Sequence, residues 1–277
     1  MKIYDTHLHT HHSHDGRFSF SEIAYEAVKR KLSGICITDH YDSALCKGNK
    51  DFVHIKKSLE ETRLCAKDFE GKLEIYAGVE LGDYLFGKKQ AQEFQKDMEF
   101  DFILCSMHAS VIGKQIIPGF NNVKFFSELK GEENNLFLKM YFKCTLDTIR
   151  DKSIDFDSLA HLTYPLRYIV AINKNTVDIE SYYPVIKEIL GVLIEKNKAL
   201  EINTSCLATD WKYTLPNYEI IKMYYDLGGR LITIGSDAHF TERIGLGIES
   251  TLGSLKEIGF VNYYIYKERK PIAISLC

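Results

Sequence analysis

Ile3-Tyr4-Asp5-Thr6-His7-Leu8-His9 is a short apolar segment that closes on two alternating histidines. Apolar runs of this length are typical of buried β-strands. Side chains alternate along a strand, so His7 and His9 face the same side and can bind one cation. Asp5 lies on that face too and is a candidate acceptor behind these ligands. We expect the next two histidines, His11 and His12, to lie in a loop.

Six more apolar runs follow, and each ends in a polar residue: residues 34–39, 73–80, 100–108, 156–161, 199–203 and 231–237. Longer segments with helical apolar spacing separate many of them: 21–31, with Ser21 as a possible cap, 52–69, 136–150, 183–196 and 217–227. Strand-then-helix units in series predict an α/β fold with a parallel sheet, closed or nearly closed into a barrel. Such a barrel gathers the polar strand ends into one site.

Composition describes an ordinary globular chain of 277 residues with a formal net charge of −3. This length suits one barrel domain over residues 1–277, with loops at 48–50 and 130–135. The balanced charge gives no basic field for nucleic acid, and no apolar run is long enough to cross a membrane. The start lacks the apolar run of a signal peptide, and the seven scattered cysteines fit reduced thiols, so we expect a cytoplasmic protein. Its oligomeric state stays open.

The polar strand ends and the loop after the first strand supply nine candidate metal ligands: His7, His9, Asp15, His40, Glu80, His108, His161, Asp237 and His239. Imidazole and carboxylate without thiolate suit Zn, Mn or Fe, and the set is large enough for two or three divalent ions. Glu80 offers two oxygens and can bridge two cations. His14 competes with Asp15, and spacing alone leaves both possible.

These residues resemble, in order, the motifs of the PHP (polymerase and histidinol phosphatase) superfamily: DTHLHT at 5–10, SHDG at 13–16, TDH at 38–40, Glu80, His108, His161 and SDAH at 236–239. The resemblance spans nearly the whole chain, and Glu201-Ile202-Asn203-Thr204-Ser205 looks like the stand-alone histidinol-phosphatase branch. It implies a distorted (β/α)7 barrel with a trinuclear centre at the carboxyl ends of the strands. The implied ligand sets are His7, His9, Glu80 and Asp237; Glu80, His108 and His161; and Asp15, His40 and His239.

The same resemblance implies a metal-dependent phosphomonoesterase of histidine biosynthesis, which converts L-histidinol phosphate and water to L-histidinol and phosphate. A metal-bound hydroxide held by Glu80 would attack phosphorus, with Asp237 and His239 as candidate proton donors. Members of the branch often carry a basic residue soon after the 201–205 strand, whereas here Lys212 is the first cation. The candidate substrate-binding residues are Arg167, Asn203 and Thr204.

Three other functions compete with this one. The same site could act on another small phosphate ester or a nucleotide. An amidohydrolase is disfavoured because that class commonly bridges its metals with a lysine, where this chain has Glu80. An inactive metal-binding regulatory module is disfavoured because such a role does not need nine candidate ligands around one cleft.

Overall fold

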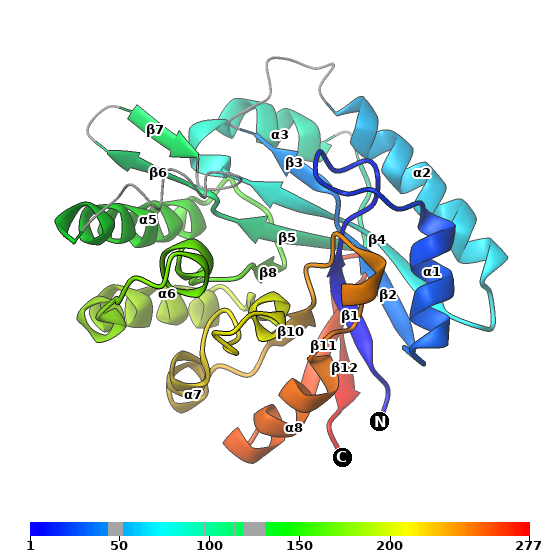
Figure 1. The fold of residues 1–277 in the computed structure, drawn as a ribbon. Coiled ribbons are helices and arrows are strands. Elements are labelled where there is room, and N and C mark those ends of the chain that lie inside the picture. The colour runs from blue at the N-terminus through cyan, green and yellow to red at the C-terminus, as the bar shows by residue number, and fades with distance from the viewer. Residues whose placement is uncertain (44–51, 97, 113–114, 119–130) are drawn as a thin grey trace.

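The protein is a nearly closed barrel of parallel strands with helices around it (Figure 1). The computed structural model describes residues 1–43, 52–96, 98–112, 115–118 and 131–277. Around the barrel the strands are β1 (Tyr4–Leu8), β2 (Gly34–Ile37), β4 (Glu74–Gly82), β5 (Phe102–Ser106), β8 (Ser158–Leu159), β9 (Ala199–Asn203) and β10 (Ile232–Gly235). A parallel bridge between Leu8 and Ala238 joins the two ends of this order. The predicted α/β barrel of seven strands is confirmed.

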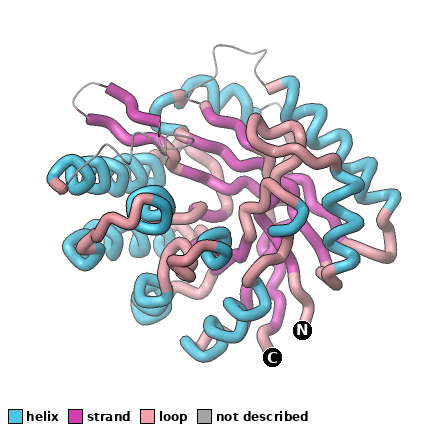
Figure 2. Tube along the Cα trace, in the orientation of Figure 1, coloured by secondary structure: helices cyan, strands magenta, loops and turns pink. Residues whose placement is uncertain are grey.

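The barrel strands are buried on both faces, which explains their continuous apolar sequences. Every residue of β1, β2, β5, β9 and β10 is buried. Figure 2 shows the strands gathered in the middle of the molecule with helices outside them. A parallel sheet covered in this way selects apolar side chains on both faces, and polar residues are left for the strand ends.

The surrounding helices are α1 (Phe20–Lys29), α2 (Val53–Asp68), α3 (Lys88–Lys96), α5 (Glu132–Arg150), α6 (Tyr183–Glu195), α7 (Tyr218–Asp226) and α8 (Ile248–Ile258). Helix α1 shows how the sequence sets a boundary. Ser19, not the predicted Ser21, is its N-cap, because Glu22 three residues later returns a hydrogen bond and completes a capping box. Phe20, Ile23 and Ala27 then form the buried face.

Several shorter elements extend the barrel. The strand β3 (His40–Asp42) pairs with the second half of β4, and the hairpins β6 (Ala109–Ile112)–β7 (Gln115–Pro118) and β11 (Asn262–Lys267)–β12 (Lys270–Ser275) lie outside the barrel order. Tyr263 of β11 ties its hairpin to the start of β1, where its hydroxyl donates to Lys2 O at 2.8 Å and accepts from Tyr4 N at 3.1 Å. A π-helix occupies Arg167–Ile172.

Some predicted boundaries were wrong. The predicted strands 156–161 and 231–237 pair only over β8 and β10, and their polar ends lie beyond the ladder. Residues 132–135, predicted as loop, begin α5, whose first turn carries the favourable acidic residues Glu132 and Glu133. The loop predicted at 48–50 lies outside the described residues. Among the described residues no helix has the length and apolar character of a membrane span.

Candidate metal centre

The nine predicted ligands reach one end of the barrel from six segments of chain. His7 lies in β1 and His9 directly after it; His40 opens β3, and Glu80 lies in the carboxyl half of β4. The remainder follow strands or lie in the loop after β1: Asp15, His108, His161, Asp237 and His239. Because carboxyl ends of parallel strands meet at one end of a barrel, the fold brings residues more than 200 positions apart into contact.

Glu80 is the centre of the cluster. Its Oε2 lies 3.2 Å from His7 Nε2, 3.4 Å from His9 Nε2 and 3.0 Å from His40 Nδ1. Its Oε1 lies 3.1 Å from the Nε2 atom of His108 and 3.0 Å from that of His161. The Glu80 side chain is only 1% exposed, so these imidazoles replace water around it. The two oxygens therefore face two separate groups of nitrogen donors.

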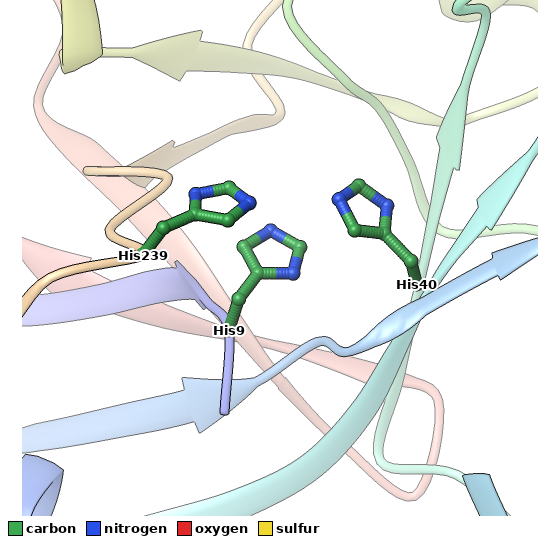
Figure 3. Close-up of side chains that lie close together, drawn as sticks. All are labelled: His9, His40 and His239. Atoms are coloured by element: carbon green, nitrogen blue, oxygen red, sulfur yellow. The ribbon is translucent and has the colours of Figure 1, made fainter. Parts of the chain in front are cut away.

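A second group of donors lies beside the first. The rings of His9, His40 and His239 approach one another from separate segments (Figure 3), with ring centroids 4.3 Å apart for His9 and His40 and 4.1 Å for His9 and His239. Asp15 Oδ2 lies 3.1 Å from His239 Nε2, and Asp15 Oδ1 lies 3.7 Å from His40 Nε2. His14 has a half-exposed side chain and lies 3.7 Å from Asp15. Asp15 thus lies beside two central imidazoles, whereas His14 lies beside one, with its ring centroid 5.1 Å from that of His40.

Burial and charge set the protonation states of the cluster. Burial raises the pKa of Glu80, but His40 and His7 outweigh burial and hold that pKa well below its ordinary value. For His9, burial and the nearby His239 and His40 act together and lower the pKa to about 3. For His7 and His40, burial lowers the pKa but neighbouring carboxylates outweigh burial and raise it. Because a divalent cation binds ionised carboxylate and neutral imidazole, its binding would release the protons of these two rings.

The positions of these nitrogen and oxygen atoms suit coordination of shared metal ions better than hydrogen bonds between the side chains. His9 Nε2, His40 Nδ1 and His239 Nε2 are buried and make no hydrogen bond with any described residue, although each lies within 3.4 Å of a carboxylate oxygen. Buried polar atoms normally have partners. Two ligands of one tetrahedral zinc ion lie roughly 3.3 Å apart, which matches these separations. The arrangement can therefore hold divalent cations.

Further polar residues contact the proposed ligands on the side that faces away from Glu80. Glu201 Oε1 lies 2.6 Å from His7 Nδ1, and its Oε2 accepts a hydrogen bond from His161 N at 2.8 Å. Ser13 Oγ lies 3.0 Å from His9 Nδ1, and Asp42 Oδ1 lies 3.1 Å from His108 Nδ1. The contacts to His7, His9 and His108 occupy Nδ1 and leave Nε2 for the centre, whereas the contact to His161 holds its backbone N–H.

The sequence interpretation did not assign these supporting roles. Glu201 was visible only as the first residue of the motif at 201–205, and nothing in the sequence pairs it with His7. Asp5, expected behind the histidines, instead accepts hydrogen bonds from the backbone N–H groups of His7, Ser236 and Gly245. It therefore holds β1 against the loop after β10 rather than orienting an imidazole.

Arg167 begins the π-helix and points its guanidinium into the site. It donates to Asp237 Oδ2 at 2.5 Å and to Ser205 Oγ at 2.7 Å, and it lies 5.0 Å from the Tyr164 ring centroid. Burial raises the pKa of Asp237, but Arg167 and His7 hold it well below the ordinary range. Asp237 itself adopts a left-handed backbone conformation with φ of 54°, which aspartate tolerates better than most residues.

The other two predicted substrate-binding residues lie deeper. Asn203 is fully buried, where its Nδ2 donates to Glu201 and Asp237, both at 3.3 Å. Thr204 donates its hydroxyl hydrogen bond to Leu246 O at 2.6 Å. Neither residue lines the inner cavity at the metal ligands or the outer cavity that leads to them.

A cavity of about 640 Å³ opens onto the cluster. It shares Asp15, Arg167, Asp237 and His239 with the smaller inner cavity that also contains Glu80. Its outer wall adds two arginines that the sequence interpretation did not single out, Arg17 and Arg243. Cationic side chains around such an opening favour an anionic ligand.

Comparisons with known proteins agree with this geometry. The family model described as "PHP domain" matches residues 5–205. A protein of Thermotoga maritima named "Probable histidinol-phosphatase" is 32% identical over 98% of this chain and 99% of its own length. The "Histidinol-phosphatase" of Lactococcus lactis is 30% identical over 94% of this chain and 93% of its own.

A solved structure extends the likeness to three dimensions. It is a histidinol phosphate phosphatase from Lactococcus lactis, complexed with zinc, L-histidinol and phosphate. It superposes on this chain with a TM-score of 0.82 at 27% identity, covering 98% of this chain and 99% of the other.

Proposed function

The chain belongs to the PHP domain family, and from this premise we propose that it is a metal-dependent phosphatase that converts L-histidinol phosphate and water to L-histidinol and phosphate. The observation that carries the choice of substrate is the end-to-end likeness to the histidinol phosphatase of Lactococcus lactis. The cluster around Glu80, at the bottom of a cavity lined by arginines, supports the chemistry.

We assign the nine predicted side chains as holding two or three divalent ions of Zn, Mn or Fe: His7, His9, Asp15, His40, Glu80, His108, His161, Asp237 and His239. When bound, such ions neutralise phosphate charge and lower the pKa of a coordinated water, to about 7 in zinc enzymes. Glu80 presents one oxygen to each of two imidazole groups, so it is the residue that would share two ions. Asp15 contacts His239 and His40 directly and is therefore preferred to His14.

Arg167 binds the phosphate group. Its planar fork can contact two oxygens of a phosphate at once, and Asp237 and Ser205 hold it at the wall shared by both cavities. Stacking against Tyr164 further restricts its orientation. Asn203 positions Asp237 and Glu201 rather than touching the substrate, and Thr204 fixes the loop through Leu246.

Of the two candidate proton donors, His239 fits better than Asp237. The Asp237 Oδ2 atom accepts hydrogen bonds from Arg167 and Asn203, and its Oδ1 lies 3.4 Å from His9 Nε2. An aspartate surrounded by donors has no proton to give. His239 lines both cavities and is 17% exposed, so it would face the leaving oxygen when two ions are bound beside Glu80 and its own ring holds none.

The setting of the reaction is the cytoplasm. Cys36, Cys65, Cys105 and Cys206 are buried and form no disulfide bond with any described residue, which suits a reducing compartment. The reacting partner is a small phosphorylated molecule.

A substrate panel tests the proposal. Phosphate release is measured from L-histidinol phosphate, a nucleoside monophosphate and an aryl phosphate, with protein loaded with Zn or Mn and with a chelated control. We expect metal-dependent release with the highest kcat/KM for L-histidinol phosphate. A higher kcat/KM for the nucleotide or the aryl ester would overturn the substrate, and equal rates in the chelated control would overturn the metal requirement.

A further inference from the structure

A second group of metal-binding side chains lies outside the central cluster. His11 and His12 lie in the loop between β1 and α1, and Glu61 lies on α2. His12 Nε2 is 3.3 Å from Glu61 Oε1, and His11 Nε2 is 3.9 Å from Glu61 Oε2. One donor atom from each of the three residues lies within 4.8 Å of the other two.

The His12 nitrogen resembles the central nitrogens in lacking a hydrogen-bond partner beside a carboxylate. Its side chain is 10% exposed, and its buried Nε2 makes no hydrogen bond with any described residue despite the nearby carboxylate. In the centre, His9 Nε2 is likewise unpaired at 3.4 Å from Glu80. Two ligands of one tetrahedral zinc ion are roughly 3.3 Å apart, so the His12–Glu61 separation suits a shared ion.

We propose that His11, His12 and Glu61 form a further site for a borderline divalent cation such as Zn²⁺. Two imidazoles and a carboxylate are ligands that this class of ion accepts, with water completing the coordination. The site is distinct from the catalytic one, because none of the three residues lines the inner or the outer cavity. Both histidine rings pack near Phe20, at centroid distances of 6.0 and 5.7 Å, which restricts their motion.

An ion at this site clips the loop after β1 to α2. Two hydrogen bonds from backbone N–H groups already anchor this loop. His11 N donates to Phe18 O at 2.9 Å, and His12 N donates to Thr10 Oγ1 at 3.1 Å. The same loop carries Asp15 and Arg17 into the outer cavity. Occupancy therefore stabilises the segment that forms one wall of the substrate cavity, and it does so whatever the substrate is.

Zinc counting tests the site. Wild type, Glu61→Gln and the double variant His11→Gln/His12→Gln are equilibrated with buffered micromolar free Zn²⁺, and bound zinc is measured by mass spectrometry. We expect wild type to hold one more equivalent than either variant. Zinc should also raise the thermal midpoint of wild type more than that of Glu61→Gln.

Glu60→Gln is the matched control, since it makes the same charge change one residue away on α2. It should keep the additional ion, and all variants should keep phosphatase activity at limiting zinc, because the central ligands are untouched. Equal zinc content in wild type and Glu61→Gln would overturn the proposal, as would an equal loss in Glu60→Gln. Glu61→Gln alters one half-exposed side chain, so it tests the proposal even where the double variant does not fold.

Discussion

His7 illustrates how one residue becomes a ligand. Glu201 lies 2.6 Å from its Nδ1 and Glu80 lies 3.2 Å from its Nε2, and all three side chains are buried. Burial lowers the pKa of His7, but Glu201 and Glu80 outweigh burial and raise it well above the ordinary value. A carboxylate that hydrogen-bonds to one ring nitrogen of an imidazole fixes the orientation of the ring and makes the other nitrogen a stronger metal ligand.

Glu201→Gln should therefore weaken the centre without removing a ligand. We expect a loss of about 10- to 100-fold in metal affinity or in kcat, because the negative charge behind His7 disappears. Metal affinity is measured by competition with a chromophoric chelator. Glu195→Gln, an exposed change at the end of α6, is the control. A Glu201→Gln protein with wild-type metal affinity and kcat would show that the Glu201 charge plays no part.

Arg167→Lys tests the phosphate contact. Lysine keeps the charge but loses the planar fork held by Asp237 and Ser205. We expect kcat/KM for L-histidinol phosphate to fall by about 10- to 100-fold, as a charged hydrogen bond is worth roughly 1.5–3 kcal/mol. Arg150→Lys, on an exposed ion pair with Glu188, should leave kcat/KM unchanged. Parallel losses in both variants would remove Arg167 from the site.

For single residues, the sequence predicts which polar side chains lie at strand ends, but it does not predict which other side chains they contact. Eight of the nine proposed ligands were visible because polar residues ended apolar runs, and Asp15 was visible because it lies in the loop after the first run. The structure brings all nine to one end of the barrel. Ser13 and Asp42 were not visible as supports, since their contacts with His9 and His108 depend on how loops fold. Arg17 and Arg243 share a cavity only because the loops after β1 and β10 meet.

Strand β10 shows a constraint at the scale of an element. Its last residue, Gly235, passes so close to β1 that an added Cβ would lie 2.3 Å from His7 Cβ and 3.0 Å from Glu201 Oε1. Both neighbours belong to the packed interior, so neither can move without displacing the centre. Glycine at this position is thus required by the approach of the two strands that close the barrel.

Gly235→Ala should lower both stability and metal content. We expect unfolding to become easier by about 1–3 kcal/mol, the usual cost of overpacking a core. Gly253→Ala in α8 is the control, because its added Cβ meets nothing within 4 Å and alanine favours a helix. Denaturant unfolding and metal analysis report the two effects. A Gly235→Ala protein as stable as wild type would mean that β10 and β1 are not packed as described.

The elements were predicted best where one rule acts alone. Strands β1, β2 and β9 followed from apolar runs, and the helices α2 and α6 followed from apolar spacing. Helix α3 was not predicted, since its sequence Lys-Lys-Gln-Ala-Gln-Glu-Phe-Gln-Lys buries only Ala91 and Phe94. The β11–β12 hairpin was not predicted either, because its fit depends on Tyr263 reaching the distant start of β1.

At the scale of the whole molecule, the candidate metal centre connects strands from around the barrel. Its proposed ligands come from β1, β3 and β4 and from the segments after β5, β8 and β10. Bound ions would thus cross-link segments from around the barrel and give partners to buried nitrogens that have none among the described residues.

Chelation should therefore lower the stability of the whole barrel. A ligand present at 100 to 1,000 times its Kd stabilises the folded state by about 2.7–4.1 kcal/mol. For a chain of this size we expect chelation to lower the thermal midpoint by roughly 5–15 °C. Scanning calorimetry with and without chelator measures the change, and restored zinc should reverse it. Identical midpoints would mean that the centre holds no tightly bound ion.

The most direct test of the account is the rate of phosphate release from L-histidinol phosphate by Glu80→Gln, measured beside wild type under saturating zinc. Glu80 is the residue whose two oxygens face both imidazole groups, and glutamine keeps its size while removing the charge. We predict a folded protein whose kcat falls by at least about 10³-fold, because the bridging carboxylate is lost. A folded Glu80→Gln protein with kcat within tenfold of wild type would contradict a catalytic centre built on Glu80.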